Sequence, residues 1–254
     1  SVKNVVILGS TGSIGKSTIE VIEANKDDFF IAGLVAKSNE KLLTEQAEKF
    51  NVKNVCLTDQ TSKNEKFISE SKMEDLIVGD QVDIVVAAIS GVVGLKTILK
   101  AVKAGKRVLI ANKEPLVAAG EILMREAEKY NSEIIPIDSE HCAIHQCLQN
   151  IDKKDLSKVI ITCSGGPFLG KKQKDLKEIS IEDALNHPVW KMGNKNLIDS
   201  ATLMNKALEI IEAKWLFNLS SEEIDVIIHP QSIIHSMIET TDHSILAVLS
   251  EPDM

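Results

Sequence analysis

The chain has 254 residues, of which 44% are hydrophobic and 26% are charged, enough for two packed domains with sizeable cores. The net charge is −8, and no block of Lys and Arg is long enough to favour nucleic acid or an anionic membrane surface as a partner. No segment has the pattern of a signal peptide or a transmembrane helix, and the cysteines lack C-x-x-C spacing, so we expect a cytoplasmic protein with reduced thiols at Cys56, Cys142, Cys147 and Cys163.

The first predicted element is a strand over Val5 to Leu8, which runs into a glycine turn and then a helix. The turn reads Gly9-Ser10-Thr11-Gly12-Ser13-Ile14-Gly15, with the spacing G-x-x-G-x-x-G in place of the strict G-x-G-x-x-G. Glycines in such a turn let the backbone approach a ligand closely, and the N-terminus of the helix attracts a pyrophosphate. The strand, turn and helix together indicate a dinucleotide-binding unit.

The second strand, Ile31 to Val35 within the apolar run Phe30 to Ala36, lies where such a unit meets the adenosine ribose, about 20 residues beyond the glycine turn. An NAD site would have Asp or Glu at the end of this strand, whereas the chain has Lys37-Ser38-Asn39. These side chains suit a 2′-phosphate, which favours NADP over NAD. The alternative is that Lys37 caps a solvated strand end.

Strands and helices continue to alternate, which is typical of a parallel sheet covered by helices. The further predicted strands are Asn54 to Leu57, Ile84 to Ala88, Arg107 to Ile110 and Glu133 to Ile137, and the predicted helices include Lys41 to Phe50, Lys96 to Lys103 and Leu116 to Tyr130. Small or polar residues follow two of these strands, at Ser90-Gly91 and at Ala111-Asn112-Lys113-Glu114, on the sheet edge where open α/β sheets bind ligands.

Three acidic residues are candidates for a metal site. Asp138 and Glu140 lie two residues apart, and Glu209 follows on a later predicted helix. Carboxylates are the hard oxygen ligands that Mg2+ and Mn2+ prefer, although acidic residues in a loop are commonly solvated surface groups. His141 and His145 are one helical turn apart and admit zinc, but without a third matching ligand they favour ordinary helix packing.

After about residue 150 the pattern changes, and we expect an α+β domain over residues 151–254 that follows a Rossmann-like, doubly wound α/β domain over residues 1–150. Its predicted strands are Val159 to Thr162, Val226 to Ile228, Ile233 to Ile238 and Ile245 to Leu249, and its main helix is Met204 to Phe217.

Two segments of this second domain are candidates for substrate contact. Ser164-Gly165-Gly166 follows a strand and exposes backbone N–H groups that suit a phosphate or hydroxyl, although a plain glycine turn has the same sequence. The segment from His187 to Gly193 combines a titratable ring, an indole and a thioether between Pro and Gly. It is either a flap that closes over a substrate or a packed loop.

The main helix of the second domain carries further polar side chains. Asn205 and Glu209 are four residues apart and Lys206 and Glu209 are three apart, which places them on one face of the helix. Ser200, Asn205 and Lys206 suit a phosphoryl group, because two donate neutral hydrogen bonds and one donates charge-assisted bonds. Asp199-Ser200-Ala201-Thr202 is predicted to cap this helix.

Six motifs occur in one order along the chain: the glycine turn, Ala111-Asn112-Lys113-Glu114, Asp138-Ser139-Glu140-His141, Ser164-Gly165-Gly166-Pro167-Phe168, His187-Pro188-Val189-Trp190-Lys191-Met192-Gly193, and the segment from Asp199 to Lys206. With them the chain resembles the 1-deoxy-D-xylulose 5-phosphate reductoisomerases, from the first strand to Glu251-Pro252-Asp253-Met254. The resemblance implies an enzyme of isoprenoid precursor synthesis that rearranges this phosphorylated sugar and reduces it to 2-C-methyl-D-erythritol 4-phosphate. It also implies NADPH, Mg2+ or Mn2+ with Co2+ as a further candidate, and a homodimer.

The resemblance also implies roles for individual residues. The implied metal ligands are Asp138, Glu140 and Glu209, and the implied catalytic residues are these three with Lys113 and His187. The implied substrate contacts are Lys113, Ser139, Glu140, Ser164, His187, Trp190, Met192, Ser200, Asn205, Lys206 and Glu209. The implied cofactor contacts are Thr11, Gly12, Ser13, Ile14, Lys37, Ser38, Asn39, Asn112, Glu114 and Gly193.

The chain departs from the family pattern at two positions and at its end. Lys37-Ser38-Asn39 differs from the Gly-Lys-Asn order of some members, and Glu114-Pro115 replaces Glu-Ser, which affects a helix start more than the chemistry. Family members continue into a linker and a C-terminal helical domain, which we expect to be absent from this chain. Two alternatives stay open: a truncated or non-catalytic NADP-binding protein, and a metal-free sugar dehydrogenase that uses Lys or His as acid and base and does not need Glu209.

Overall fold

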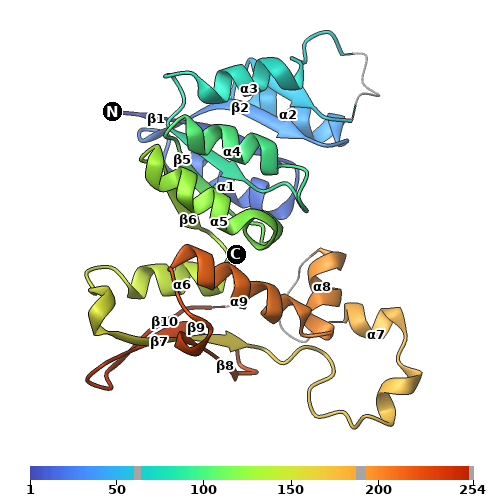
Figure 1. Cartoon of the computed structure of the whole chain (residues 1–254). Coiled ribbons are helices and arrows are strands. Elements are labelled where there is room, and N and C mark those ends of the chain that lie inside the picture. The colour runs from blue at the N-terminus through green and yellow to red at the C-terminus, as the bar shows by residue number, and fades with distance from the viewer. Residues whose placement is uncertain (60–63, 187–192, 252–254) are drawn as a thin grey trace. The chain divides into compact units, whose positions relative to one another are not determined.

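The computed structural model describes residues 1–59, 64–186 and 193–251, and the chain divides into two compact units, Ser1–Ile137 and Asp138–Met254 (Figure 1). This division differs from the expected one after residue 150. The helix α6 (Ser139–Cys147) belongs to the second unit, because its Ile144 and Cys147 pack in the core of that unit.

The first unit is a six-stranded parallel sheet in the order β3-β2-β1-β4-β5-β6. Its strands are β1 (Lys3–Leu8), β2 (Phe29–Ala36), β3 (Asn54–Leu57), β4 (Ile84–Ala87), β5 (Arg107–Ile110) and β6 (Glu133–Pro136). Its helices are α1 (Ser13–Ala24), α2 (Glu40–Lys49), α3 (Glu70–Val78), α4 (Leu95–Lys103) and α5 (Glu114–Lys129). This is the Rossmann strand order, so the predicted fold of the first domain is confirmed.

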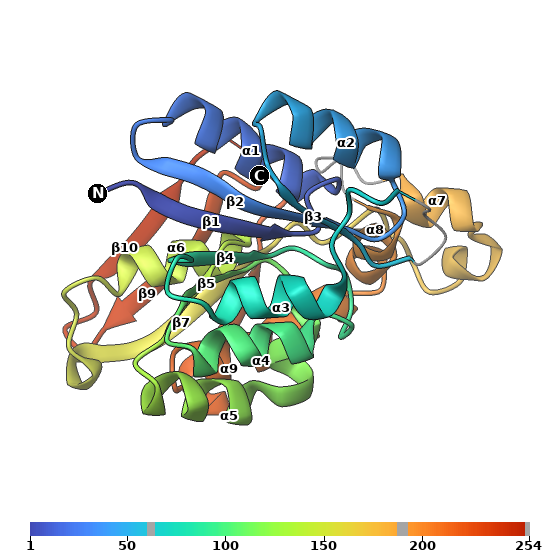
Figure 2. The ribbon, with the colours of Figure 1, turned by 90° about the horizontal axis from the view of Figure 1, so that it is seen from above.

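Helices cover both faces of this sheet, which explains why its central strand residues are apolar. Figure 2 shows α1 and α2 on one face and α3, α4 and α5 on the other. Central strand residues such as Val6, Ile7 and Leu34 are fully buried. The order of the strands reverses between β1 and β4, and the carboxyl ends of these strands therefore flank the crevice where such sheets bind ligands.

The predicted strands and helices of the first domain are all present, and their ends differ from the prediction by two residues at most. The sequence analysis did not predict α3, which Ser69 caps by accepting a hydrogen bond from Lys72 N at 3.3 Å. Pro115 lies in the first turn of α5, where its missing N–H costs no helical hydrogen bond, as expected for a helix start.

The second unit is a four-stranded mixed sheet in the order β10-β9-β7-β8. Strands β7 (Leu156–Cys163) and β8 (Ile224–Ile228) are parallel, whereas β9 (Ile234–Thr240) pairs antiparallel with both β7 and β10 (Ile245–Leu249). Its other helices are α7 (Ile181–Leu185), α8 (Asn194–Ala201), α9 (Met204–Leu216) and short 3-10 turns at Lys153–Asp155, Asp175–Glu178 and Ser221–Glu223. The predicted α+β character is confirmed.

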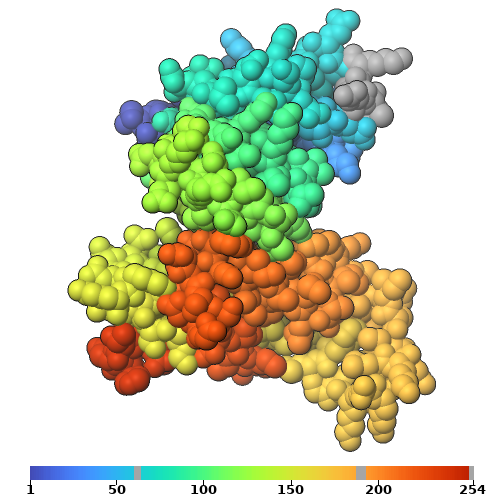
Figure 3. Space-filling model, viewed as in Figure 1, coloured from blue at the N-terminus to red at the C-terminus, as the bar shows by residue number. Residues whose placement is uncertain are grey.

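Helices α6 and α9 lie on one face of this sheet, and their apolar residues form the core with the strands (Figure 1). Val159, Ile161 and Ile238 are buried against Ile144 and Ala213. The segment around α7 extends away from this body, as the ribbon and the space-filling view both show (Figures 1 and 3).

The structure corrects one prediction about the start of α9. Asp199, Ser200 and Ala201 do not cap this helix, because they form the end of a separate helix, α8. Leu203 takes the N-cap position with φ 61°, in the left-handed region, and makes no side-chain capping bond. Lys195 and Asp199 form an i, i+4 ion pair of 2.6 Å, which supports the helical conformation of this segment.

Among the described residues, no helix has both the length and the apolar character that crossing a membrane requires. The four cysteines are free thiols, as the sequence predicts.

Candidate active site

Three carboxylates from two helices meet in the second unit. Asp138 is the N-cap residue of α6, Glu140 lies in its first turn, and Glu209 lies on α9. One oxygen from each carboxylate lies within 4.8 Å of the others. Asp138 and Glu209 are buried, and Glu140 is partly buried. We call these three residues the carboxylate cluster, and its oxygen donors suit a hard divalent cation such as Mg2+ or Mn2+.

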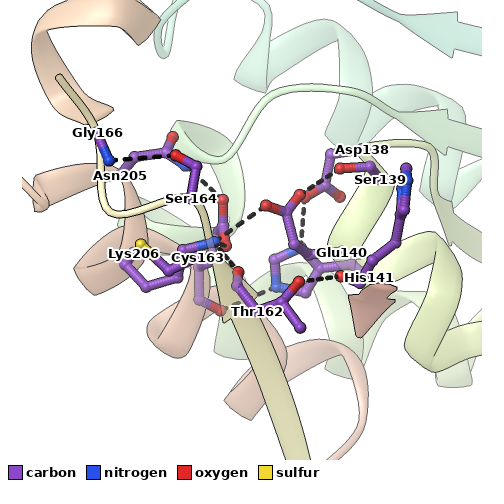
Figure 4. Close-up of polar contacts among 12 residues, drawn as sticks. Asp138, Ser139, Glu140, His141, Thr162, Cys163, Ser164, Gly166, Asn205 and Lys206 are labelled. Atoms are coloured by element: carbon purple, nitrogen blue, oxygen red, sulfur yellow. Dashed lines mark hydrogen bonds and ion pairs between the residues drawn. The ribbon is translucent and has the colours of Figure 1, made fainter. Parts of the chain in front are cut away.

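Lys206 pairs directly with two members of the carboxylate cluster. Its Nζ donates to Glu209 Oε2 at 2.5 Å, to the carbonyl oxygen of Thr162 at 2.6 Å and to Glu140 Oε1 at 3.0 Å (Figure 4). Burial opposes the charge of this ammonium, but Glu140 and Glu209 outweigh burial and hold the Lys206 pKa above its ordinary value. The ammonium is therefore charged, and it forms ion pairs with both carboxylates.

His141 is a second buried cation beside the carboxylate cluster. Its Nδ1 lies 2.6 Å from Asp138 Oδ2 and 3.3 Å from Glu212 Oε2, and its Nε2 lies 2.9 Å from the carbonyl oxygen of Glu209. Burial alone would lower the pKa of His141, but Asp138 and Glu212 outweigh burial and raise it to about 10. The imidazole is therefore protonated at neutral pH.

The charges of this group fit a divalent cation. Four carboxylates, the cluster and Glu212, form ion pairs with two cations, Lys206 and His141. Within this set of six side chains the negative charge exceeds the positive charge, and buried charge is costly unless a counter-ion compensates it. A bound Mg2+ or Mn2+ ion would offset the excess, so both the donor chemistry and the sign of the charge fit the expected metal.

The residues expected to bind phosphate lie around the start of α9. Ser164 Oγ accepts a hydrogen bond from Gly166 N at 3.2 Å, and Asn205 Nδ2 donates to Glu209 Oε1 at 2.5 Å. Gly166 has φ 70°, and a Cβ there would lie 2.7 Å from the carbonyl oxygen of Ser200. The glycine loop after β7 therefore packs directly against the end of α8, which brings Ser164 and Ser200 into one region.

The other expected substrate residues belong to different parts of the chain. Ser139 Oγ donates to Glu140 Oε2 at 2.5 Å, so this hydroxyl belongs to the carboxylate cluster's surroundings. Lys113 is the N-cap residue of α5 in the first unit. The expected residues His187, Trp190 and Met192 lie outside the described residues.

The expected cofactor residues gather at the carboxyl ends of β1, β2 and β5. Thr11 and Gly12 precede α1, whose first residues are Ser13 and Ile14; Lys37, Ser38 and Asn39 follow β2, and Asn112 and Glu114 follow β5. Asn39 Oδ1 accepts from Leu42 N at 3.2 Å and so also caps α2. Asn112 Nδ2 is buried and meets no hydrogen-bond partner among the described residues, which leaves this donor for a ligand. Gly193 belongs to the second unit, where it is the N-cap residue of α8.

The glycine turn has close contacts on two sides. Gly9 has φ 90°, and a Cβ there would lie 2.5 Å from the carbonyl oxygen of Ala88, so the turn lies against the end of β4. Gln46 on α2 is buried, and its Nε2 donates to the carbonyl oxygen of Ser10 at 2.9 Å. A pocket of about 560 Å³ lies beyond β3 and is lined by Leu57, Asp59, Asn64, Phe67, Ile68, Ser69, Glu70 and Ser71.

The sequence analysis missed Glu212, Gln46 and the contact of His141 with the carboxylate cluster. For Glu212 and for the contact of His141, the available signal was a spacing of three residues on a helix. This spacing relates Glu209 to Glu212 and Asp138 to His141. No local pattern pointed to Gln46, because its partner Ser10 lies 36 residues away.

Comparisons with known proteins match the chain to one family. Residues 5–120 match the family model for 1-deoxy-D-xylulose 5-phosphate reductoisomerase, and residues 134–217 match the model for the C-terminal domain of 1-deoxy-D-xylulose 5-phosphate reductoisomerase. A 1-deoxy-D-xylulose 5-phosphate reductoisomerase of Thermoanaerobacter sp. (strain X514) is 49% identical over 99% of the chain and 68% of its own length.

Two solved structures are also similar to the chain. A crystal structure of DOX-P reductoisomerase in complex with NADPH, fosmidomycin and magnesium is 40% identical in sequence, with a TM-score of 0.90. The match covers 99% of this chain and 67% of the chain in that structure. The 1-deoxy-D-xylulose 5-phosphate reductoisomerase of Zymomonas mobilis in complex with NADPH is 38% identical in sequence, with a TM-score of 0.91. The match covers all of this chain and 68% of the chain in that structure.

Proposed function

The chain belongs to the 1-deoxy-D-xylulose 5-phosphate reductoisomerase family, and from that premise we propose that its carboxylate cluster holds the divalent metal ion of the reaction. The reaction converts 1-deoxy-D-xylulose 5-phosphate into 2-C-methyl-D-erythritol 4-phosphate by a rearrangement followed by a reduction, with NADPH as reductant. The observation that carries the proposal is the convergence of three carboxylates from two helices, two of them buried, on one point of the second unit.

Asp138, Glu140 and Glu209 would hold Mg2+ or Mn2+ from two helices, with Co2+ as a further candidate. When bound, the ion supplies Lewis-acid polarisation of the substrate's oxygens. The residues around the carboxylate cluster hold its side chains in place and limit their contact with water. Lys206 holds Glu140 and Glu209 through its hydrogen bonds, and the burial of Asp138 and Glu209 excludes water from their side of the cluster.

The phosphate of the substrate would bind where the glycine loop after β7 meets α8 and α9. Ser164, Ser200 and Asn205 donate neutral hydrogen bonds there, and Lys206 supplies the positive charge. Lys113 and Ser139 would contact the substrate hydroxyls, and Lys113 and His187 are the further candidate catalytic residues. His187, Trp190 and Met192, which lie outside the described residues, would also contact the substrate.

NADPH would bind at the carboxyl ends of β1, β2 and β5. Thr11, Gly12, Ser13 and Ile14 would contact its pyrophosphate, because the N–H groups of Ser13 and Ile14 lie in the first turn of α1. Lys37, Ser38 and Asn39 would contact the 2′-phosphate, while Asn112 with its buried donor, Glu114 and Gly193 would contact the nicotinamide half.

We propose that the protein is a homodimer built on the open face of the second unit's sheet. This face, opposite α6 and α9, carries Ile160, Met237 and Ile245, and the outer-strand residues Ile227 and Ala247 share it by register. Ile227 and Ile245 are exposed, and Lys158 on the same face pairs with Asp225 at 2.8 Å. A second copy would cover this apolar surface with the same surface of its own.

The test measures NADPH oxidation after addition of 1-deoxy-D-xylulose 5-phosphate, with Mn2+ present and then chelated, in the full-length protein. We expect oxidation that depends on metal. The substitution Glu209→Gln should abolish turnover and leave NADPH affinity unchanged, because Glu209 is a metal ligand in the unit that does not hold the nucleotide fold. Glu222→Gln, an exposed residue of the same unit, is the control with the same chemical change.

Three results would argue against the proposal in different ways. Oxidation that survives chelation favours a metal-free sugar dehydrogenase. NADPH binding without any oxidation favours a non-catalytic NADP-binding protein. Retention of most activity by Glu209→Gln would remove Glu209 from the metal site.

A further inference from the structure

His141 joins the two helices that supply the carboxylate cluster. The residue lies on α6, three positions after Asp138, and its ring contacts the backbone of Glu209 on α9. The distances are 2.6 Å from Nδ1 to Asp138 Oδ2 and 2.9 Å from Nε2 to the carbonyl oxygen of Glu209. Since a carboxylate and a carbonyl oxygen only accept hydrogen bonds, both ring nitrogens must donate.

The two hydrogen bonds of the His141 ring occupy both of its nitrogens in this arrangement. Asp138, His141 and Glu212 have ligand atoms within 4.8 Å of one another, which by distance alone would admit a second ion. Both ring nitrogens are already engaged, Nδ1 with the Asp138 carboxylate and Nε2 with the carbonyl oxygen of Glu209. The ring therefore acts as a connection between α6 and α9.

The ring is fixed in this orientation by its other neighbours. Glu212 Oε2 lies 3.3 Å from Nδ1, and Phe217 stacks on the ring with a centroid distance of 6.3 Å and an interplanar angle of 19°. His141 and Glu212 are both fully buried. Glu212 on α9 and Phe217 at the end of α9 thus restrict the rotation of the ring. Asp138, at the start of α6, restricts it from the other helix.

We propose that His141 is a positioning residue that holds the Asp138 carboxylate and the backbone of Glu209 at the separation the metal ion requires. This inference rests on the proposed metal role of the carboxylate cluster. Asp138 and Glu209 come from different helices, and the His141 side chain hydrogen-bonds to both residues. Loss of a partner that orients a metal ligand typically weakens metal affinity by about 10- to 100-fold.

The test is a titration of the full-length protein with Mn2+, in which electron paramagnetic resonance reports the free ion. We expect His141→Leu to raise the Mn2+ dissociation constant by about 10- to 100-fold. His141→Asn should have an intermediate effect, because its amide can donate to Asp138 but is too short to reach the Glu209 carbonyl as well. His145→Leu is the matched control, one turn further along α6, where His145 pairs with Gln149 and contacts no member of the carboxylate cluster among the described residues.

Two further measurements separate positioning from a general loss of structure. NADPH affinity should be unchanged in all three variants, since the dinucleotide-binding fold is the first unit. Thermal unfolding shows whether each variant is folded at the titration temperature. If His141→Leu does not fold, the folded His141→Asn variant decides the question, and its Mn2+ affinity should still be several-fold weaker.

Wild-type Mn2+ affinity in a folded His141→Leu or His141→Asn variant would overturn the inference and leave the metal site intact. An equal loss in His145→Leu would also overturn it, because the effect would then belong to α6 as a whole. A wild-type protein that binds no Mn2+ would overturn the proposed metal site itself.

Discussion

Gly166 lies where a side chain would collide with the end of α8. Its φ is 70°, and a Cβ would meet the Ser200 carbonyl oxygen at 2.7 Å. We expect Gly166→Ala to lower the free energy of unfolding by about 1–2 kcal/mol for the left-handed backbone and by about 1–3 kcal/mol more for the collision. It should also raise the KM for the phosphorylated substrate, because Ser164 and Ser200 lie on the two sides of this contact.

Gly170 provides the control for this prediction. It has φ 81°, and a Cβ there would meet nothing within 4 Å, so Gly170→Ala tests the backbone conformation without the collision. Urea unfolding of both variants gives the comparison. Equal losses of stability would mean that the contact with Ser200 does not constrain the loop.

Glu223 gives a prediction about pH. Lys153 Nζ donates to its Oε1 at 2.7 Å and Ser220 N to its Oε2 at 2.8 Å, and these bonds lower the Glu223 pKa from 4.5 to about 2. Because the folded pKa is below the unfolded one, the stabilisation is complete above about pH 4.5 and is lost as the pH falls toward 2. The free energy of unfolding of Glu223→Gln should thus lie below that of wild type at neutral pH.

Urea unfolding at neutral pH and near pH 3 measures this difference, which should shrink at the lower pH. Glu222→Gln, the exposed neighbour, removes the same charge and corrects for the change in net charge. A difference that stays constant between the two pH values would show that the Glu223 carboxylate has an ordinary pKa.

Sequence spacing predicted one part of the site well. Asn205, Lys206 and Glu209 share a helical face because of their spacing, and the structure has the bonds of Asn205 and Lys206 to Glu209. The same spacing relates Glu212 to Glu209, but it does not predict that Glu212 is buried. A glutamate inside an amphipathic helix usually faces water, and only the packing of α9 against α6 places Glu212 beside His141.

At the scale of elements, the alternation of apolar strands with amphipathic helices was sufficient to predict the first unit. The link between α8 and α9 was not predictable from local sequence. Leucine rarely adopts φ above zero, so nothing at Leu203 signals the reversal that separates the two helices. The polar run Asp199 to Thr202 has the composition of a cap, yet Asp199 to Ala201 continue α8 because the residues before them are also helical. Thr202, the C-cap residue of α8, contacts the start of α9, where its Oγ1 accepts from Met204 N at 3.4 Å.

Helix α2 supports the glycine turn through a single buried side chain. Gln46 Nε2 donates to the Ser10 carbonyl oxygen at 2.9 Å, and Gln46 is buried between α2 and the turn. We expect Gln46→Met, which keeps the length and removes the donor, to weaken NADPH binding by several-fold, since one hydrogen bond contributes about 0.5–1.5 kcal/mol.

Fluorescence titration with NADPH measures this effect, and the Mn2+ affinity of the second unit is the internal control. Glu45→Gln, on the exposed side of the same helix, should bind NADPH as wild type does. If Gln46→Met retains full NADPH affinity, the contact supports the fold of α2 and not the position of the turn.

At the scale of the molecule, the proposed homodimer predicts that one charge on the open sheet face separates the subunits. Ile245 on β10 is 58% exposed and shares this face with Met237 and Ile160 by register. We expect Ile245→Lys to shift the protein from dimer to monomer in analytical ultracentrifugation, because an isologous interface would bury two such ammonium groups.

Val21→Lys is the matched control, since Val21 on α1 of the first unit is also 58% exposed. It should leave the sedimentation coefficient unchanged. A monomeric wild-type protein, or a dimer that tolerates Ile245→Lys, would contradict the assignment of this face.

The four-stranded sheet ends in two exposed edges, β10 and β8. Each edge strand directs backbone N–H and C=O groups outward and carries exposed apolar side chains, among them Ile227, Ile228 and Leu249. Such an edge is a template for another extended segment, so the isolated chain at high concentration is prone to aggregate by strand addition. We therefore expect a charged residue introduced within β8 or β10 to slow this aggregation.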